Sequence, residues 1–204
     1  MPTRSYVSPV REAAAARKRE RVVREAVRFL REEESISTFS LEAIARAAGV
    51  TRLTVYNQFG SRRGLLEAVF DELARRGRLN RITDAMSRPN PRDGLDELIG
   101  IFCDFWSGDP AVARLADVMA IDVELAQGLV DRNERRRKAL RTLVGRIAAD
   151  GAGAAAQRDS VDVIFALTSF PVFRLLAKGR SAKATCALIR SAATDAIDRI
   201  ARRA

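Results

Sequence analysis

The most regular pattern of apolar and polar positions in this chain lies in residues 38–73. Its first part places apolar side chains at intervals of three, four and seven, the spacing of one face of an α-helix. These positions are Leu41, Ile44, Ala45 and Ala48. Ser40 precedes them as an N-cap, and Gly49 follows as a residue that can end a helix and turn sharply. The pattern predicts a helix over Leu41–Ala48.

Two further helical segments follow this first one. Thr51 is suited to cap a second short helix, Arg52–Gln58, in which Val55 points inward. Ser61 is suited to cap a third helix, Arg62–Asn80. Its apolar stripe consists of Leu65, Leu66, Val69, Phe70 and Leu73. Two short helices joined by a turn with glycine form a helix-turn-helix, in which the second helix can lie in the major groove of DNA.

The rest of the chain also shows helical periodicity, without evident strands or repeats. The fold class we expect is therefore all-α, with about nine helices. Besides the three above, the expected helices are Val10–Glu33, Leu95–Ser107, Pro110–Ala120, Val123–Ala149, Ser160–Lys178 and a last one after Ser181. The clearest linker is Ser87–Gly94, which holds two prolines, an asparagine and a glycine. We expect a DNA-binding domain over residues 1–80, with Arg62–Asn80 as its connector, and a second domain over residues 81–204.

The expected helix Ser160–Lys178 differs from the others because it is apolar on nearly every side. A small monomer does not expose such a helix. Pro171 should kink it. We expect this helix and the last one to form the contact of a homodimer, with four helices in the interface.

Composition narrows the possible functions. The chain has no histidine, which excludes histidine-based triads and zinc sites that need histidine. It lacks phosphate-binding glycine loops, and its carboxylates are scattered among arginines. We therefore expect no catalytic residues, no metal site and no cofactor, and thus a protein that is not an enzyme.

The charge of the chain agrees with a polyanionic partner. The net charge is +10, and residues 1–80 carry 16 Lys/Arg against 10 Asp/Glu, which is +6 of that total. Basic proteins gain affinity for DNA by releasing condensed counterions. Arg4 and Arg11 could touch phosphates from the N-terminal arm, although a disordered tail is the simpler reading. The basic run at 132–138 could be a second nucleic-acid site, but we expect it to be a solvated helix face.

Cysteine usage and hydropathy indicate the cellular compartment in which we expect the protein. Cys103 and Cys186 lie in apolar surroundings and are expected to be reduced thiols rather than a disulfide. No apolar run approaches the roughly 18 residues of a membrane span, and the N-terminal segment lacks the apolar core of a signal peptide. We expect a cytoplasmic protein with no membrane partner.

Residues 38–73 closely resemble the tetracycline-repressor (TetR) family. The family pattern I-A-x-x-A-G-V-[ST]-x-x-x-x-Y-x-x-F matches residues 44–59, and L-L-x-x-V matches residues 65–69. Gly64 departs from the polar helix former that is usual there, and Gly60 replaces a frequent lysine. Both departures should weaken the start of the following helix.

The resemblance implies which residues face DNA. The groove-facing set that it implies is Arg52, Leu53, Thr54, Tyr56, Asn57 and Gln58. By their chemistry, Arg52 could read guanine, and Asn57 or Gln58 could read adenine. Ser40, Thr51, Tyr56 and Arg62 suit phosphates. Tyr56 has an alternative reading as a half-buried aromatic of the core.

A second candidate site lies in the C-terminal half, where aromatic, soft and hydroxyl side chains could converge. These residues are Phe102, Cys103, Phe105, Trp106, Leu115, Met119, Phe165, Thr168, Ser169 and Val172. They could simply fill a core, but the family binds its inducer in this region, so the resemblance favours a pocket. The lining lacks Arg, Lys and His, which predicts a largely apolar ligand that is neutral or cationic. Asp104 or Asp122 could supply a counter-charge.

Together these observations predict a ligand-responsive transcriptional regulator, a repressor that binds a palindromic operator as a homodimer and is released by a small molecule. Two alternatives remain. One is a constitutive architectural DNA-binding protein whose C-terminal half only dimerises. The other is a helical enzyme or interaction module with an inert helix-turn-helix, against which the missing histidine and motifs argue.

Overall fold

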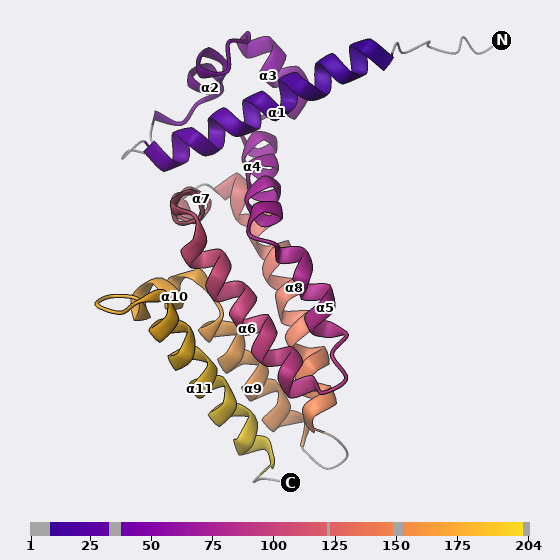
Figure 1. The fold of residues 1–204 in the computed structure, drawn as a ribbon, viewed down its shortest axis with the longest axis vertical. Helices are drawn as coiled ribbons and strands as arrows, with labels where there is room; N and C mark the ends of the chain where they lie inside the picture. Colours follow the sequence, from indigo (N-terminus) through magenta and orange to yellow (C-terminus); the bar gives the residue numbers. More distant parts are fainter. Residues whose placement is uncertain (1–8, 33–37, 122, 149–152, 202–204) are drawn as a thin grey trace, which may run out of the picture. The chain divides into compact units, whose positions relative to one another are not determined.

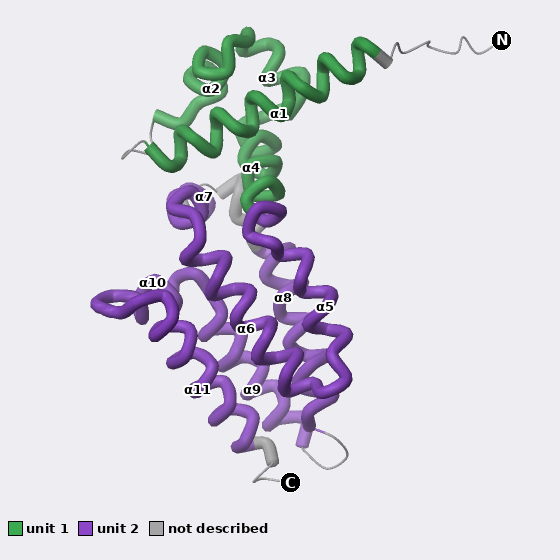
Figure 2. Tube along the Cα trace, in the orientation of Figure 1, with its two compact units in different colours: residues 1–73 green, residues 74–204 purple. Residues whose placement is uncertain are grey.

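The computed structural model describes residues 9–32, 38–121, 123–148 and 153–201, and all regular structure in these ranges is helical. Within these ranges there are eleven α-helices, and a short 3-10 helix lies between α4 and α5. Figure 1 shows their arrangement. They divide into two compact units, residues 1–73 and 74–204 (Figure 2). The expected all-α class is confirmed. The functional boundary at residue 80 stays a prediction, because the division into units reflects only the density of contacts.

The first unit contains four helices. They are α1 (Pro9–Glu32), α2 (Leu41–Ala47), α3 (Arg52–Phe59) and α4 (Arg62–Arg76), the last of which runs just past the boundary. Helix α1 packs against both α2 and α3. Its buried side chains recur at helical spacing and are Val22, Val23, Ala26, Val27 and Leu30. Phe29 is half-buried and meets Phe39 edge to face at 5.7 Å between ring centroids.

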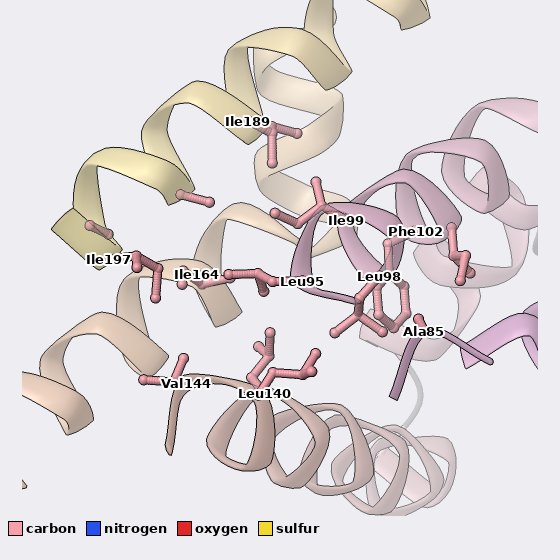
Figure 3. Packing of buried hydrophobic residues seen from close by; sticks show 14 of the residues in the cluster. Ala85, Leu95, Leu98, Ile99, Phe102, Leu140, Val144, Ile164, Ile189 and Ile197 are labelled. Carbon is pink, nitrogen blue, oxygen red and sulfur yellow. The ribbon is translucent and has the colours of Figure 1, made fainter. Parts of the chain in front are cut away.

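The second unit contains the remaining helices. They are η2 (Leu79–Arg81), α5 (Ile82–Met86), α6 (Pro91–Gly108), α7 (Pro110–Ile121), α8 (Val123–Ala148), α9 (Ala154–Leu167), α10 (Phe170–Leu176) and α11 (Ala182–Ala201). Helix α6 is central, because it packs against α5, α7, α8, α10 and α11. Figure 3 shows Leu95, Leu98 and Ile99 of α6 between the apolar side chains of α8 and those of α11.

The structure departs from the nine expected helices at three places, two of which, α5 and α10, add a helix. The expected helix to Asn80 ends at Arg76, and Arg78 then takes a left-handed conformation with φ of 54° before η2 and α5. Asn90 caps α6 directly at Pro91, so half of the expected linker is helical. Pro171 does not kink one long helix. It stands in the first turn of a separate helix, α10, because proline fits the start of a helix and not its interior.

The two cysteines are free, as expected. Cys103 on α6 is buried, and Cys186 on α11 is half-buried. Burial, with the neighbouring Cys186 thiol as a further cause, raises the pKa of Cys103 well above its usual range. The Cys103 thiol therefore stays protonated and is a poor nucleophile.

In the described ranges no helix is long and apolar enough to cross a membrane. Nor do these ranges contain a group of three or more His, Cys, Asp or Glu side chains that could hold a metal ion.

Candidate nucleic-acid interface

Helices α2 and α3 form the predicted helix-turn-helix. The Ser40 hydroxyl accepts a hydrogen bond from the Ala43 amide at 3.1 Å and so caps α2. Gly49 then takes a φ of 60°, a left-handed conformation that glycine adopts without steric cost. In the turn, the Val50 amide donates to the carbonyl of Ala45 at 3.0 Å. The turn is thus fixed by hydrogen bonds on both sides of Gly49.

Helix α3 begins with a well-formed cap. The Thr51 hydroxyl accepts a hydrogen bond from the Thr54 amide at 3.1 Å, and the two threonine hydroxyls lie 2.9 Å apart. Only Val55 is fully buried in this helix. Its apolar side chain holds α3 to the unit, while the other side chains of α3 are exposed or half-buried. The N-terminal end of this helix is capped, and its backbone amides there also favour an anion.

The exposed face of α3 carries most of the predicted DNA-facing side chains. Leu53 and Tyr56 are 65% and 56% exposed, large values for apolar and aromatic side chains. Arg52 and Asn57 are exposed, and Thr54 is half-buried. The alternative reading of Tyr56 as a core aromatic does not hold in this structure.

Gln58 is placed differently from the rest of the predicted set. Its side-chain amide donates to the Ala15 carbonyl of α1 at 3.4 Å, and its own backbone carbonyl accepts from Arg19 at 2.9 Å. The Arg19 guanidinium also lies over the Phe59 ring, 4.3 Å from its centroid. Gln58 therefore helps to join α3 to α1, and of the two predicted adenine readers Asn57 is the one presented to solvent.

Arg62 is also engaged within its unit. It is half-buried and donates from Nε to the Phe39 carbonyl at 3.3 Å, with its guanidinium 5.8 Å from the Phe39 ring centroid. This arrangement ties the start of α4 to the residue before the α2 cap. Ser40 and Thr51 remain exposed, and both cap hydroxyls accept hydrogen bonds from backbone amides. The Ser40 hydroxyl can therefore donate to a phosphate, and the Thr51 hydroxyl can do so when Thr54 is the donor in the bond between the two threonines.

Gly64, the departure from the family pattern, has a packing role. A Cβ at this position would lie 2.0 Å from the carbonyl oxygen of Phe59, the last residue of α3. Ser61 still caps the turn, since its hydroxyl accepts from the Gly64 amide at 3.1 Å. Gly64 thus lets α4 start directly beside the end of α3, rather than merely weakening the helix.

The predicted ligand wall in the second unit consists mostly of buried, packed side chains. Phe102, Phe105, Leu115, Met119 and Thr168 are buried. Trp106, Phe165 and Val172 are half-buried. The Trp106 ring lies 6.2 Å from Phe102, 4.9 Å from Phe105 and 5.4 Å from Phe170, between ring centroids.

Two members of that wall have other surroundings. The Ser169 hydroxyl caps α10 and donates to the Ala166 carbonyl at 2.6 Å. Cys103 lines a cavity of about 620 Å³ between α6 and α11, together with charged residues. Those residues include Arg81, Asp96, Asp104 and Arg190. Of the two predicted counter-charges, Asp104 forms an ion pair with Arg81 at 3.4 Å. The other, Asp122, lies outside the described residues.

The predicted lining lacks arginine, but the structure places one arginine beside two of its aromatic residues. Arg136, within the run expected to be solvated, is only 8% exposed. Its guanidinium lies 5.6 Å from the centroid of Phe102 and 4.3 Å from that of Phe165. A signal existed, because Arg136 precedes Leu140 by four and Leu143 by seven positions, which puts it on the buried stripe of α8.

Comparison with known proteins agrees with this arrangement. Residues 25–69 match the model of the family described as "Bacterial regulatory proteins, tetR family". A stretch of 68 residues is 43% identical to the HTH-type transcriptional regulator AlkX of Mycobacterium tuberculosis. That match spans only a third of this chain (33%) and a third of the relative (32%).

Likeness to solved structures extends over nearly the whole chain. SCO4454, a TetR-family transcriptional regulator from Streptomyces coelicolor, superposes with a TM-score of 0.66 at 18% identity, over 91% of this chain and 96% of that one. SmeT, solved as a complex with triclosan, gives a TM-score of 0.66 at 16% identity, over 88% and 91%. At such identities these likenesses concern the fold alone.

Proposed function

We propose that this chain, which belongs to the TetR family of bacterial regulatory proteins, is a transcriptional repressor that binds a palindromic operator as a homodimer and is released by a small molecule. The observation that carries the proposal is the capped helix α3, whose exposed face presents Arg52, Leu53, Tyr56 and Asn57. A buried packing helix would not present a guanidinium, a phenol and an amide together.

The exposed side chains divide by the part of DNA that each suits. Arg52 can donate two hydrogen bonds to a guanine edge, and Asn57 can pair with an adenine edge. Leu53 can contact a thymine methyl group. Ser40, Thr51 and Tyr56 carry hydroxyls that suit phosphates, which position the protein without reading sequence. Thr54 is oriented by its bond to Thr51, and Gln58 and Arg62 act through packing as well as through any contact with DNA.

A homodimer would present two copies of α3 to the two halves of a palindrome. Its support is a group of exposed apolar side chains in the second unit that includes Val163, Leu175 and Leu188. They lie on α9, α10 and α11, and α9 packs against α11. Two recognition helices one helical turn of DNA apart, about 34 Å, would fit successive major grooves.

Release by a ligand requires that the unit with the helix-turn-helix, or the dimer, can adopt two geometries. A ligand shifts that equilibrium only by its preference for one geometry. The triclosan complex of SmeT supports a small-molecule site in a protein of this fold. In this chain the proposed site is the aromatic wall of α6, α7, α9 and α10, apart from Cys103 and Ser169, which have the other surroundings described above.

The test begins with selection of binding sites from random duplex DNA, followed by footprinting and fluorescence anisotropy on the selected site. We expect a discrete palindrome. Alanine at Arg52 or Asn57 should cost about 1–3 kcal/mol on that site and little on random DNA. Arg141→Ala, which removes an exposed arginine of α8, is the matched control for net charge and should leave the selectivity unchanged.

Two outcomes would contradict the proposal. A footprint that grows with DNA length and has no preferred sequence would identify an architectural DNA-binding protein instead. Loss of affinity that is equal on the selected site and on random DNA would move Arg52 or Asn57 from base reading to phosphate contact.

A further inference from the structure

Arg136 of α8 is a buried cation whose hydrogen bonds are incomplete. Its Nη1 donates to the carbonyl of Thr168 at 2.9 Å. Its Nε is buried and has no acceptor, and no hydrogen bond joins Nη2 to any described residue. One edge of the guanidinium, Nε with Nη2, therefore has no partner within the described protein.

The charge of Arg136 is also uncompensated. No carboxylate among the described residues forms an ion pair with it. Burial, followed by repulsion from Arg137, lowers its pKa to about 10, still well above neutral pH. Arginine is almost never this deeply buried unless it is paired, because desolvation of the charge is costly. The faces of Phe102 and Phe165 offset only part of that cost.

The surroundings of Arg136 are otherwise apolar and aromatic. Phe102 and Phe165 flank the guanidinium, and Trp106 donates from Nε1 to the same Thr168 carbonyl at 3.0 Å. These three side chains belong to the wall where the proposed function places its effector. The wall thus has a positive charge where the sequence suggested none, and this reverses the expected charge of the ligand.

We propose that Arg136 anchors the carboxylate of an effector whose body is apolar, a monocarboxylic acid with an alkyl or aromatic frame. This proposal rests on the proposed function, because it names the ligand class of the same site. The Nε–Nη2 edge of a guanidinium matches the two oxygens of a carboxylate. A phosphate monoester needs more donors than one half-occupied guanidinium offers. The rings of Phe102, Phe165 and Trp106 would contact the apolar body.

The experiment compares acids with their uncharged counterparts on the full chain. Octanoate, decanoate and 2-naphthoate are each paired with the primary amide of the same frame, and binding is measured by calorimetry and by thermal shift. For wild type we expect the carboxylates to bind at least tenfold more tightly than the amides. Arg136→Met should lose that preference, whereas Arg136→Lys, which keeps the charge but not the two-pronged geometry, should keep part of it. Arg141→Met on the exposed face of α8 is the matched control and should bind like wild type.

The unliganded variants separate an anchor from a structural role. Thr168 keeps its bond from Trp106 when Arg136 is replaced, and methionine fills a similar volume without a charge to desolvate. Arg136→Met should therefore melt at the same temperature as wild type or higher. A clear fall in melting temperature, with carboxylate binding intact, would make Arg136 a structural residue and overturn the proposal.

Failure of this proposal is distinguishable from failure of the proposed function. Equal binding of acids and amides to both wild type and Arg136→Met would reject the carboxylate anchor while leaving a ligand-responsive repressor possible. Absence of binding by every carboxylate of the panel would also reject it. By contrast, failure of the unliganded protein to select any DNA site would reject the proposed function whatever Arg136 binds.

Discussion

Gly64 and Gly145 both lie within helices, but their surroundings predict opposite effects of an added methyl group. At Gly64 of α4 a Cβ would lie 2.0 Å from the Phe59 carbonyl oxygen, so α3 or α4 must shift. At Gly145 of α8 nothing lies within 4 Å of the Cβ position. We expect Gly64→Ala to destabilise the fold by about 1–3 kcal/mol, as overpacking does, and to weaken DNA binding by displacing α3.

Gly145→Ala is the matched control for this prediction. Alanine loses less backbone entropy than glycine in a helix, so this variant should gain about 0.5–1 kcal/mol. Urea unfolding of both variants, read by circular dichroism, provides the measurement. If Gly64→Ala were as stable as Gly145→Ala, the close approach of α4 to α3 would not constrain the helix-turn-helix.

Residue roles could be predicted where a local rule decides them, and not where packing does. The caps Ser40 and Thr51 and the buried Val55 follow from side-chain chemistry and spacing. Gln58 and Arg62 have the same polar character as Arg52 and Asn57, and only their bonds to Ala15 and Phe39 separate them. The helical spacing of Arg136 with the buried leucines of α8 indicates burial. A run of basic residues nevertheless predicts exposure to solvent, because charged side chains are usually exposed whatever their spacing.

At the scale of elements, the recognition helix depends on its first residue. Without the Thr51 hydroxyl the Thr54 amide loses its acceptor and the two-hydroxyl contact disappears. Thr51→Ala should cost about 0.5–2 kcal/mol of stability, the usual loss for an N-cap, whereas Thr51→Ser should retain most of it. Both are measured by urea unfolding.

The same pair of variants tests whether the cap also serves DNA. Serine keeps the hydroxyl for a phosphate, so Thr51→Ser should bind the selected operator nearly as wild type does. Thr51→Ala should weaken binding to operator and random DNA alike. Full stability in Thr51→Ala would show that the 3.1 Å bond contributes nothing to α3.

Element boundaries were predictable where a cap, a glycine or a proline stands at the end, and less so where the end depends on tertiary packing. Helices α2 and α3 have nearly the predicted bounds. The helix α5 was absent from the prediction, because five residues are too few to show a period. Pro171 was recognised as a disturbance, but the Ser169 cap that turns a kink into a new helix depends on a single hydroxyl.

At the scale of the whole molecule, fold class was predictable because helical periodicity pervades the chain, and family was predictable because the motif is local. The C-terminal site was less accessible. Its aromatic wall comes from separate helices, and whether such side chains enclose a ligand or a core depends on distances that no periodicity encodes. The cavity lined by Cys103 lies over a different face of α6, where small residues such as Gly100 stand among charged ones such as Asp96 and Asp104.

Dimer formation is a prediction at this scale too. Leu188 on α11 is 40% exposed, so glutamate there can reach solvent in a monomer and should not unfold the chain. Within a dimer contact the same carboxylate would be buried beside its symmetry mate, which costs several kcal/mol when unpaired. We expect Leu188→Glu to sediment as a folded monomer at concentrations where wild type is a dimer. Thr142→Glu on the exposed face of α8 adds the same charge elsewhere and should leave the dimer intact.

The DNA-binding consequence follows from the loss of the second recognition helix. A monomer contacts one half-site, so Leu188→Glu should lose tight binding to the palindrome while its affinity for an isolated half-site stays near that of the wild-type subunit. Sedimentation velocity and anisotropy on full and half operators measure both effects. If Leu188→Glu sediments as a stable dimer, then α11 does not form the interface at this position, and the exposed side chains of α9 and α10, Val163 and Leu175, become the next candidates.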